Sequence, residues 1–206
     1  MNISETVKSA VWVQPYLESV VRFVGNDHVD ECLERWREPH RKFHTLLHLQ
    51  SVIECFPTED PGFALAALYH DAVYEPGLPD NETKSAELLR KHSQEFFPGV
   101  TDSEARVNFD TVIAKANRII LSTAVFRHKE DPDEEAFFCA DCQVLLGDWE
   151  ALLVYEERIR AEFQNVHEAL YMSGRCSFLE NASEVFPENA ELLLRLRDHV
   201  KAGENK

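Results

Sequence analysis

Two short stretches in the first half of the chain place side chains that bind metals inside apolar sequence. In the first, His44 and His48 lie four positions apart, a spacing that puts two side chains on one face of a helix. In the second, His70 and Asp71 directly follow the apolar run at residues 63–69. Imidazole and carboxylate groups are ligands for divalent metals, and burying them without partners is costly. These residues therefore predict either a metal centre or a buried hydrogen-bond network.

The order of His48, the pair His70 and Asp71, and a distant aspartate resembles the H…HD…D signature of the HD superfamily of metal-dependent phosphohydrolases. The resemblance implies a metal held by these three residues and by a second aspartate. It assigns that role to Asp141, which stands in an apolar run where an unpaired carboxylate would be costly. Asp110 is the alternative ligand, and its neighbours are more polar.

The local sequence sharpens this resemblance. Residues 43–48 and 67–71 are similar to the His-x-x-x-His and HD segments of cyclic-nucleotide phosphodiesterases. Residues 80–82 (Asp-Asn-Glu) match a triplet that a family of small bacterial HD proteins carries soon after its HD pair. The resemblance is dense over residues 41–86 and thinner around Asp141. The purine-clamping glutamine of the phosphodiesterases has no counterpart that we can locate, so cyclic-nucleotide specificity is not implied.

The HD relatives allow two assignments for His44 and His48. In the phosphodiesterase pattern the second histidine is the metal ligand and the first is the catalytic acid. In the Arg-x-x-His pattern of other HD proteins, which Arg41 and His44 also fit, His44 would be the ligand. We favour His48 as the ligand and His44 beside the scissile phosphate, where an imidazole titrates in the right range to protonate the leaving oxygen. Asp71 would both ligate the metal and orient the attacking water.

Further residues near the HD pair are candidates for roles in the reaction. Arg41 and Lys84 are basic residues that can contact phosphate, or that can be solvated surface charges. Glu82 is a candidate catalytic base, a partner of His70, or an acid favoured at a helix start. His128 would serve as a further ligand if the site holds a second metal.

Helices must position all of these residues, because their apolar periodicity is helical and no strand-like alternation occurs. The sequence predicts an all-α fold of roughly nine or ten helices, and the resemblance implies that they form a single HD-domain-like helical bundle. Its single domain spans residues 1–206, with a motif core at 40–145 and flanking helices within 5–36 and 148–201. Helices expected near the site cover residues 39–56, 60–74, 81–97, 101–121, 137–147 and 149–174.

Composition and charge limit the classes of partner. The chain has 206 residues, of which 44% are hydrophobic, enough for one domain with a buried core. A net charge of −16 argues against nucleic-acid polymers and anionic membranes, which bind basic surfaces. Five scattered cysteines, no signal-peptide pattern and no long apolar run predict a reduced, cytoplasmic protein.

The sequence therefore predicts a divalent-metal-dependent phosphohydrolase that acts on a small phosphate ester, with a nucleotide as the favoured substrate. Histidine and carboxylate ligands suit Mn, Fe, Zn, Ni, Co or Mg. One alternative is a metal- and nucleotide-binding HD module that acts as a sensor with little or no turnover. Another is a helical scaffold whose histidines and aspartates form buried networks. We leave open whether the chain forms a homodimer.

Overall fold

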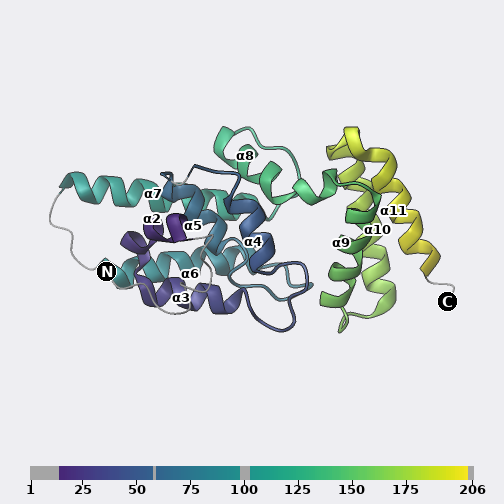
Figure 1. Cartoon of the computed structure of the whole chain (residues 1–206), viewed down its shortest axis with the longest axis horizontal. Helices are drawn as coiled ribbons and strands as arrows, with labels where there is room; N and C mark the ends of the chain where they lie inside the picture. The colour runs from purple at the N-terminus through teal and green to yellow at the C-terminus, as the bar shows by residue number, and fades with distance from the viewer. Residues whose placement is uncertain (1–13, 58, 98–102, 204–206) are drawn as a thin grey trace. The chain divides into compact units, whose positions relative to one another are not determined.

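Helices account for every regular element within residues 14–57, 59–97 and 103–203, the residues that the computed structural model of the chain describes (Figure 1). The prediction of an all-α fold is confirmed. The chain divides into two compact units, residues 1–137 and 138–206, and the single-domain organisation stays a prediction. The part of the predicted N-terminal helix that precedes Gln14 lies outside the described residues.

The first unit is built around one helix, α5 (Pro61–Tyr69), in which every residue from Gly62 onward is buried. Its residues are apolar on every side, which is typical of a helix surrounded by protein. Asp60 caps its N-terminus by accepting hydrogen bonds from the backbone N–H groups of Gly62 and Phe63. The helices that surround it and pack on it are α2 (Gln14–Val24), α3 (Asn26–Arg35), α4 (Leu46–Ile53), α6 (Asn81–Phe96) and α7 (Ser103–Ser122).

The loop between α5 and α6 is held by Asn81, the middle residue of the Asp-Asn-Glu triplet. Its side-chain oxygen accepts a hydrogen bond from the Glu75 N–H, and its nitrogen donates to the carbonyls of Glu75 and Leu78. Asp80 occupies the N-cap position of α6 without a capping hydrogen bond from its side chain. Asn81 therefore has a structural role, fixing the chain that follows the HD pair.

The second unit includes the helices α9 (Trp149–Glu162), α10 (Glu168–Val185) and α11 (Ala190–Ala202), and α11 packs against both of the others. Asp148 caps the first of them, accepting a hydrogen bond from the Ala151 N–H. The prediction of one helix from residue 149 to Gly174 is wrong. Phe163 ends one helix, and His167 caps the next by accepting from the Ala169 N–H. The elements are η2 (Gln143–Leu146), α9 (Trp149–Glu162), α10 (Glu168–Val185), η3 (Pro187–Asn189) and α11 (Ala190–Ala202).

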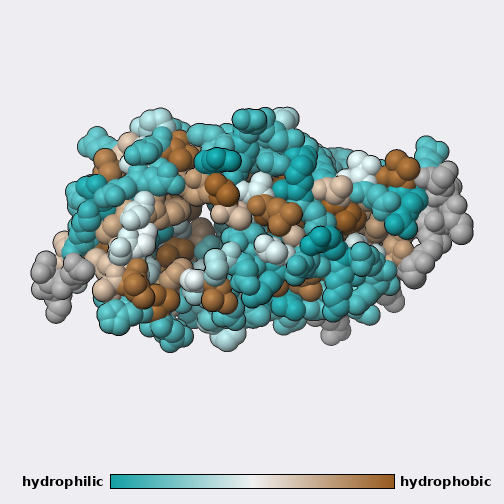
Figure 2. All heavy atoms as spheres, turned by 180° about the vertical axis from the view of Figure 1, so that it is seen from behind, coloured by the Kyte–Doolittle hydropathy of each residue, from teal (hydrophilic) through white to brown (hydrophobic). Residues whose placement is uncertain are grey.

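Apolar side chains gather in separate groups on a mostly hydrophilic surface in the view of Figure 2. Exposed examples include Leu47, Leu78, Val107 and Leu170. Within the part of the chain that the structure describes, no helix combines the length and the hydropathy needed to cross a lipid bilayer.

The core of the first unit contains a buried histidine, His92. Its Nδ1 is 2.9 Å from the Tyr69 hydroxyl, and its ring stacks on that of His28 with 4.0 Å between centroids. The Glu31 carboxylate lies 3.4 Å from its Nε2. Burial, aided by the neighbouring His28, lowers the pKa of His92 to about 4. The imidazole is therefore neutral at pH 7.

This histidine makes the stability of the fold depend on pH. An unfolded histidine has a pKa near 6.5, so the unfolded chain takes up the proton first as the pH falls. The contribution of His92 is complete above pH 6.5 and is lost as the pH falls to about 4. We expect His92→Gln to reduce the loss of unfolding free energy over this range by about 3 kcal/mol. Denaturant unfolding at a series of pH values measures it.

The control for this experiment is His199→Gln, which removes an exposed histidine. It should leave the pH profile of the unfolding free energy as it is in the unchanged chain. Equal pH profiles for His92→Gln and the unchanged chain would show that His92 does not cause this pH dependence of stability.

Candidate metal centre

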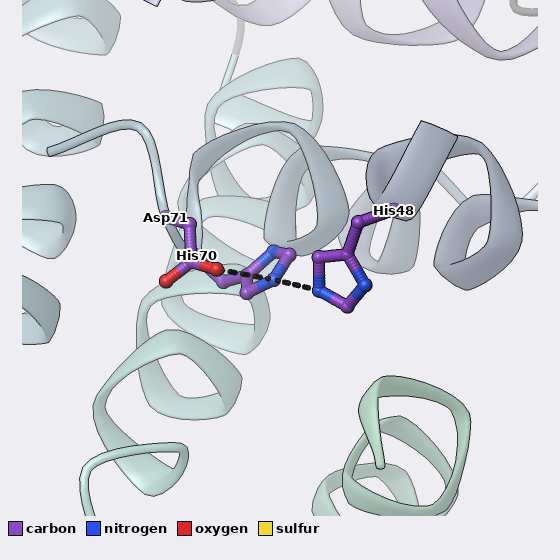
Figure 3. Close-up of side chains that lie close together, drawn as sticks. All are labelled: His48, His70 and Asp71. Atoms are coloured by element: carbon purple, nitrogen blue, oxygen red, sulfur yellow. Dashed lines mark hydrogen bonds and ion pairs between the residues drawn. The ribbon is translucent and has the colours of Figure 1, made fainter. Parts of the chain in front are cut away.

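Three of the predicted metal ligands, His48, His70 and Asp71, converge in the first unit (Figure 3). Each offers one ligand atom, and the three atoms lie within 4.8 Å of one another. The two Nε2 atoms are 3.4 Å apart, and Nε2 of His70 is 3.3 Å from the Asp71 carboxylate. Both histidines are buried and the aspartate is half-buried. The structure therefore brings together one carboxylate and two imidazoles from separate segments of the chain.

His48 lies in the first turn of α4, which begins later than predicted. The helix expected from residue 39 starts only at Leu46, because Thr45 has an extended backbone and its hydroxyl accepts from the Leu47 N–H as an N-cap. His44 consequently stands in the loop before the helix. The prediction that His44 and His48 share a helical face is wrong, although their rings still lie 5.5 Å apart.

His70 and Asp71 stand where α5 ends, at the helix cap and in the turn after it. The predicted extension of this helix to residue 74 is wrong. The backbone groups beyond the helix find partners elsewhere, since the Val73 N–H donates to the Ser85 hydroxyl and Arg41 takes two carbonyls. Adjacent side chains on a helix point about 100° apart. Ending the helix here allows both ligands to face one point.

Aromatic side chains pack against the two imidazoles of the cluster. The Trp36 indole N–H donates to the Leu68 carbonyl at 2.8 Å, and its ring lies 5.3 Å from that of His70 and 6.2 Å from that of His48. Phe137 meets the His70 ring edge-on at 5.4 Å. An apolar shell of this kind restricts water and orients ligands. The sequence analysis missed Trp36, because nothing in its spacing connects it to the HD pair.

The geometry of the cluster fits a divalent ion. His70 Nδ1 lies 2.9 Å from the Ala67 carbonyl, which can only accept, so Nδ1 carries the proton and Nε2 presents a lone pair. That lone pair faces a carboxylate and a second imidazole nitrogen. Two nitrogens bound tetrahedrally at about 2.1 Å lie about 3.4 Å apart, which matches the separation between His48 and His70. His48 Nε2, His70 Nε2 and the Asp71 carboxylate are therefore the atoms that would hold the ion.

His44 lies beside this cluster. Its Nε2 is 3.9 Å from the Asp71 carboxylate, beyond hydrogen-bond distance, and its ring packs on Tyr74 with 4.3 Å between centroids. The side chain is 20% exposed, against 2% for His70, so it is the more accessible imidazole. This position is consistent with the preferred assignment, in which His48 is the ligand and His44 acts on the substrate.

The other predicted reaction residues in the first unit have different surroundings. Lys84 forms an exposed ion pair with Asp80 at 2.9 Å, one turn away on α6. Glu82 is half-buried in the first turn of the same helix. His128 is exposed and lies 2.7 Å from the Glu135 carboxylate. Among the described residues, the group of converging ligand atoms includes none of these side chains, and their roles stay predictions.

Arg41 is buried, unlike an ordinary substrate-binding arginine at the mouth of a pocket. Its guanidinium donates to the backbone carbonyls of Asp71 and Ala72 and to the Glu38 carboxylate. The assignment of Arg41 to substrate binding stays a prediction.

Asp141 is the last residue of α8 (Pro132–Asp141) and belongs to the second unit, whereas the three clustered ligands belong to the first. Its assignment as the fourth ligand stays a prediction. The alternative, Asp110, is exposed and forms a surface ion pair with Arg106 at 2.9 Å. Because the Asp110 carboxylate is exposed and already pairs with Arg106, no metal is required to balance its charge.

Comparison with known proteins adds no relative to this description. No protein-family model, no curated protein and no solved structure matches the chain. Membership of the HD superfamily therefore stays a prediction, which depends on the resemblance of residues 41–86 and on the cluster of His48, His70 and Asp71.

Proposed function

We propose that this chain is a divalent-metal-dependent phosphohydrolase that acts on a small phosphate ester, with a nucleotide as the favoured substrate. The observation that carries the proposal is the convergence of His48 Nε2, His70 Nε2 and the Asp71 carboxylate at distances suited to one ion. A bound divalent ion supplies positive charge and activates water for hydrolysis. Phosphoryl transfer needs mainly such charge and correct positioning.

The chain's own residues supply the acid–base part of this proposal. In the protonated form, His44 would donate its proton to the oxygen that leaves the phosphate, and its Nε2 lies 3.9 Å from the Asp71 carboxylate. Asp71 would accept a hydrogen bond from the attacking water and so orient it. The Tyr74 ring, packed against His44, limits the orientations of the imidazole.

The electrostatics favour a small substrate over a polymer. The net charge of −16 repels a long phosphate backbone, whereas a single phosphate group requires positive charge only at the cluster itself. One ion held by His48, His70 and Asp71, together with the imidazole of His44 in its protonated form, would provide that charge.

The first test is the metal content of the purified chain, measured beside His70→Ala by elemental analysis. We expect about one ion per chain for a site of this donor set, and its loss in the variant, because the imidazole supplies one of the three ligand atoms. No bound metal after incubation with Mn²⁺, Fe²⁺ and Zn²⁺ would contradict the proposal. A second ion that stays bound in the purified chain would support the prediction that His128 is a further ligand.

Turnover then separates the enzyme from the sensor. The metal-loaded chain is assayed with nucleoside mono-, di- and triphosphates and with p-nitrophenyl phosphate, by release of phosphate or nitrophenol. Hydrolysis that is lost with the metal supports the enzyme. Nucleotide binding without turnover would replace the enzyme by a sensor built on the same metal site.

A further inference from the structure

Arg41 is a buried cation near the candidate metal centre. The exposed fraction of its side chain is 0%. Nη1 donates to the Asp71 carbonyl at 2.7 Å, Nη2 donates to the Ala72 carbonyl at 3.3 Å, and Nε and Nη2 share one oxygen of Glu38 at 3.1 and 3.0 Å. Every nitrogen of the guanidinium therefore has a protein acceptor.

Two aromatic rings complete the surroundings of this guanidinium. Its carbon lies 5.4 Å from the centroid of the Trp36 ring and 5.2 Å from that of Tyr74. Planar guanidinium groups stack favourably on aromatic rings. Trp36 also packs on the His70 ring, and Tyr74 packs on the His44 ring. Arg41 thus contacts the two rings that pack on His70 and His44.

The two carbonyls that Arg41 binds belong to the turn that follows α5, at Asp71 and at the residue after it. These residues lie beyond the last residue of the helix, Tyr69, so no helical hydrogen bond holds them in place. The side-chain direction of Asp71 follows from its backbone conformation, so a bond to its carbonyl also restricts where its carboxylate points.

Arg41 also connects the two segments that supply the ligands. It precedes α4, which carries His48, and it bonds to the turn that carries Asp71. A shift of this turn would move the Asp71 carboxylate away from the two Nε2 atoms. Lysine at this position could not hold the turn in the same way, because a single ammonium group does not present the fork of donors that meets several acceptors together.

We propose that Arg41 is a positioning residue that sets the Asp71 carboxylate against His48 and His70 by binding the backbone of the turn after α5. The inference rests on the proposed metal centre and replaces a direct contact between Arg41 and the substrate. It makes metal affinity, rather than substrate affinity, the property that depends on Arg41.

A double-mutant cycle on Co²⁺ affinity tests this inference, with Arg41→Lys and Asp71→Ala as the two changes. Calorimetry with Co²⁺ alone gives the dissociation constants, and the visible spectrum of the Co²⁺-saturated protein reports the ligands. We expect Arg41→Lys to weaken Co²⁺ binding roughly 10–100-fold, as for other residues that orient a ligand. In the Asp71→Ala background it should cause no further loss, because its effect passes through Asp71.

Two other variants keep the test sharp. Arg37→Lys is the matched control, because Arg37 lies in the same segment and pairs only with the exposed Glu34 among the contacts described, so Co²⁺ affinity should not change. Glu38→Gln removes the negative charge that pairs with Arg41. Because the Glu38 side chain is half-exposed, this change is not expected to prevent folding. It should weaken Co²⁺ binding in the same direction as Arg41→Lys, and by less.

Each outcome has a definite meaning. An equal loss of Co²⁺ affinity in both backgrounds would overturn the inference, because Arg41 would then act independently of Asp71. Unchanged affinity together with a raised KM for the substrate would also overturn it, in favour of substrate contact. Failure of the unchanged chain to bind Co²⁺ would overturn the proposed metal centre itself, and the inference with it.

Discussion

Asp71→Ala is expected to weaken metal binding more than about 100-fold and to abolish hydrolysis while the helical content stays unchanged. Asp71 supplies the one carboxylate of the three converging residues, so its loss removes both a ligand atom and the negative charge that balances the ion. The effect should exceed the roughly 10–100-fold losses that follow removal of residues that only orient a ligand. Metal content, hydrolysis rate and far-ultraviolet circular dichroism measure the three quantities.

The fold should tolerate this substitution. Asp71 lies beyond the last residue of α5, and its carbonyl, which Arg41 binds, is kept by alanine. Asp198→Ala is the matched control, because it removes the same charge from an exposed surface pair with Arg197 and should change neither metal content nor rate. Full metal content and activity in Asp71→Ala would show that the ion, or the reaction, is elsewhere.

The sequence was sufficient to predict the helical fold and the members of the cluster. The run before His70 is apolar on every side and follows a capping aspartate and a proline, which together predict a buried helix. A buried helix that ends in histidine and aspartate must provide partners for them. The other half of the site, His48, was predicted from the resemblance, and the structure places it next to His70.

The ends of the helices near the site could not be predicted in the same way. Local periodicity extends the helix of His70 to residue 74, because the competing partners lie far away in the sequence. Ser85 accepts the N–H of Val73, which a longer helix would have used, and Arg41 binds two carbonyls of the turn. The start of α4, by contrast, could have been predicted. A threonine before a short apolar run is a recognised N-cap signal, and Thr45 marks the start of α4 in this way.

The largest expected effect on stability concerns an ion pair buried in the second unit. Arg175 Nε donates to one oxygen of Glu156 at 2.7 Å, and the Tyr171 hydroxyl donates to the other oxygen at 2.7 Å. Both side chains of the ion pair are only 7% exposed. Breaking one partner of a buried pair costs about 3–5 kcal/mol, because the other charge stays buried without compensation. We expect this loss of unfolding free energy for Glu156→Gln.

The size of the effect depends on burial, which an exposed ion pair in the same unit can show. Glu180 of α10 pairs with Arg197 and Lys201 at the surface, and Glu180→Gln should cost less than about 1 kcal/mol, as is usual for exposed pairs. Denaturant unfolding of both variants measures the difference. Replacing both Glu156 and Arg175 with apolar residues should restore part of the lost stability, because no charge is then left unpaired. Equal small losses for Glu156→Gln and Glu180→Gln would mean that water reaches the Arg175 guanidinium.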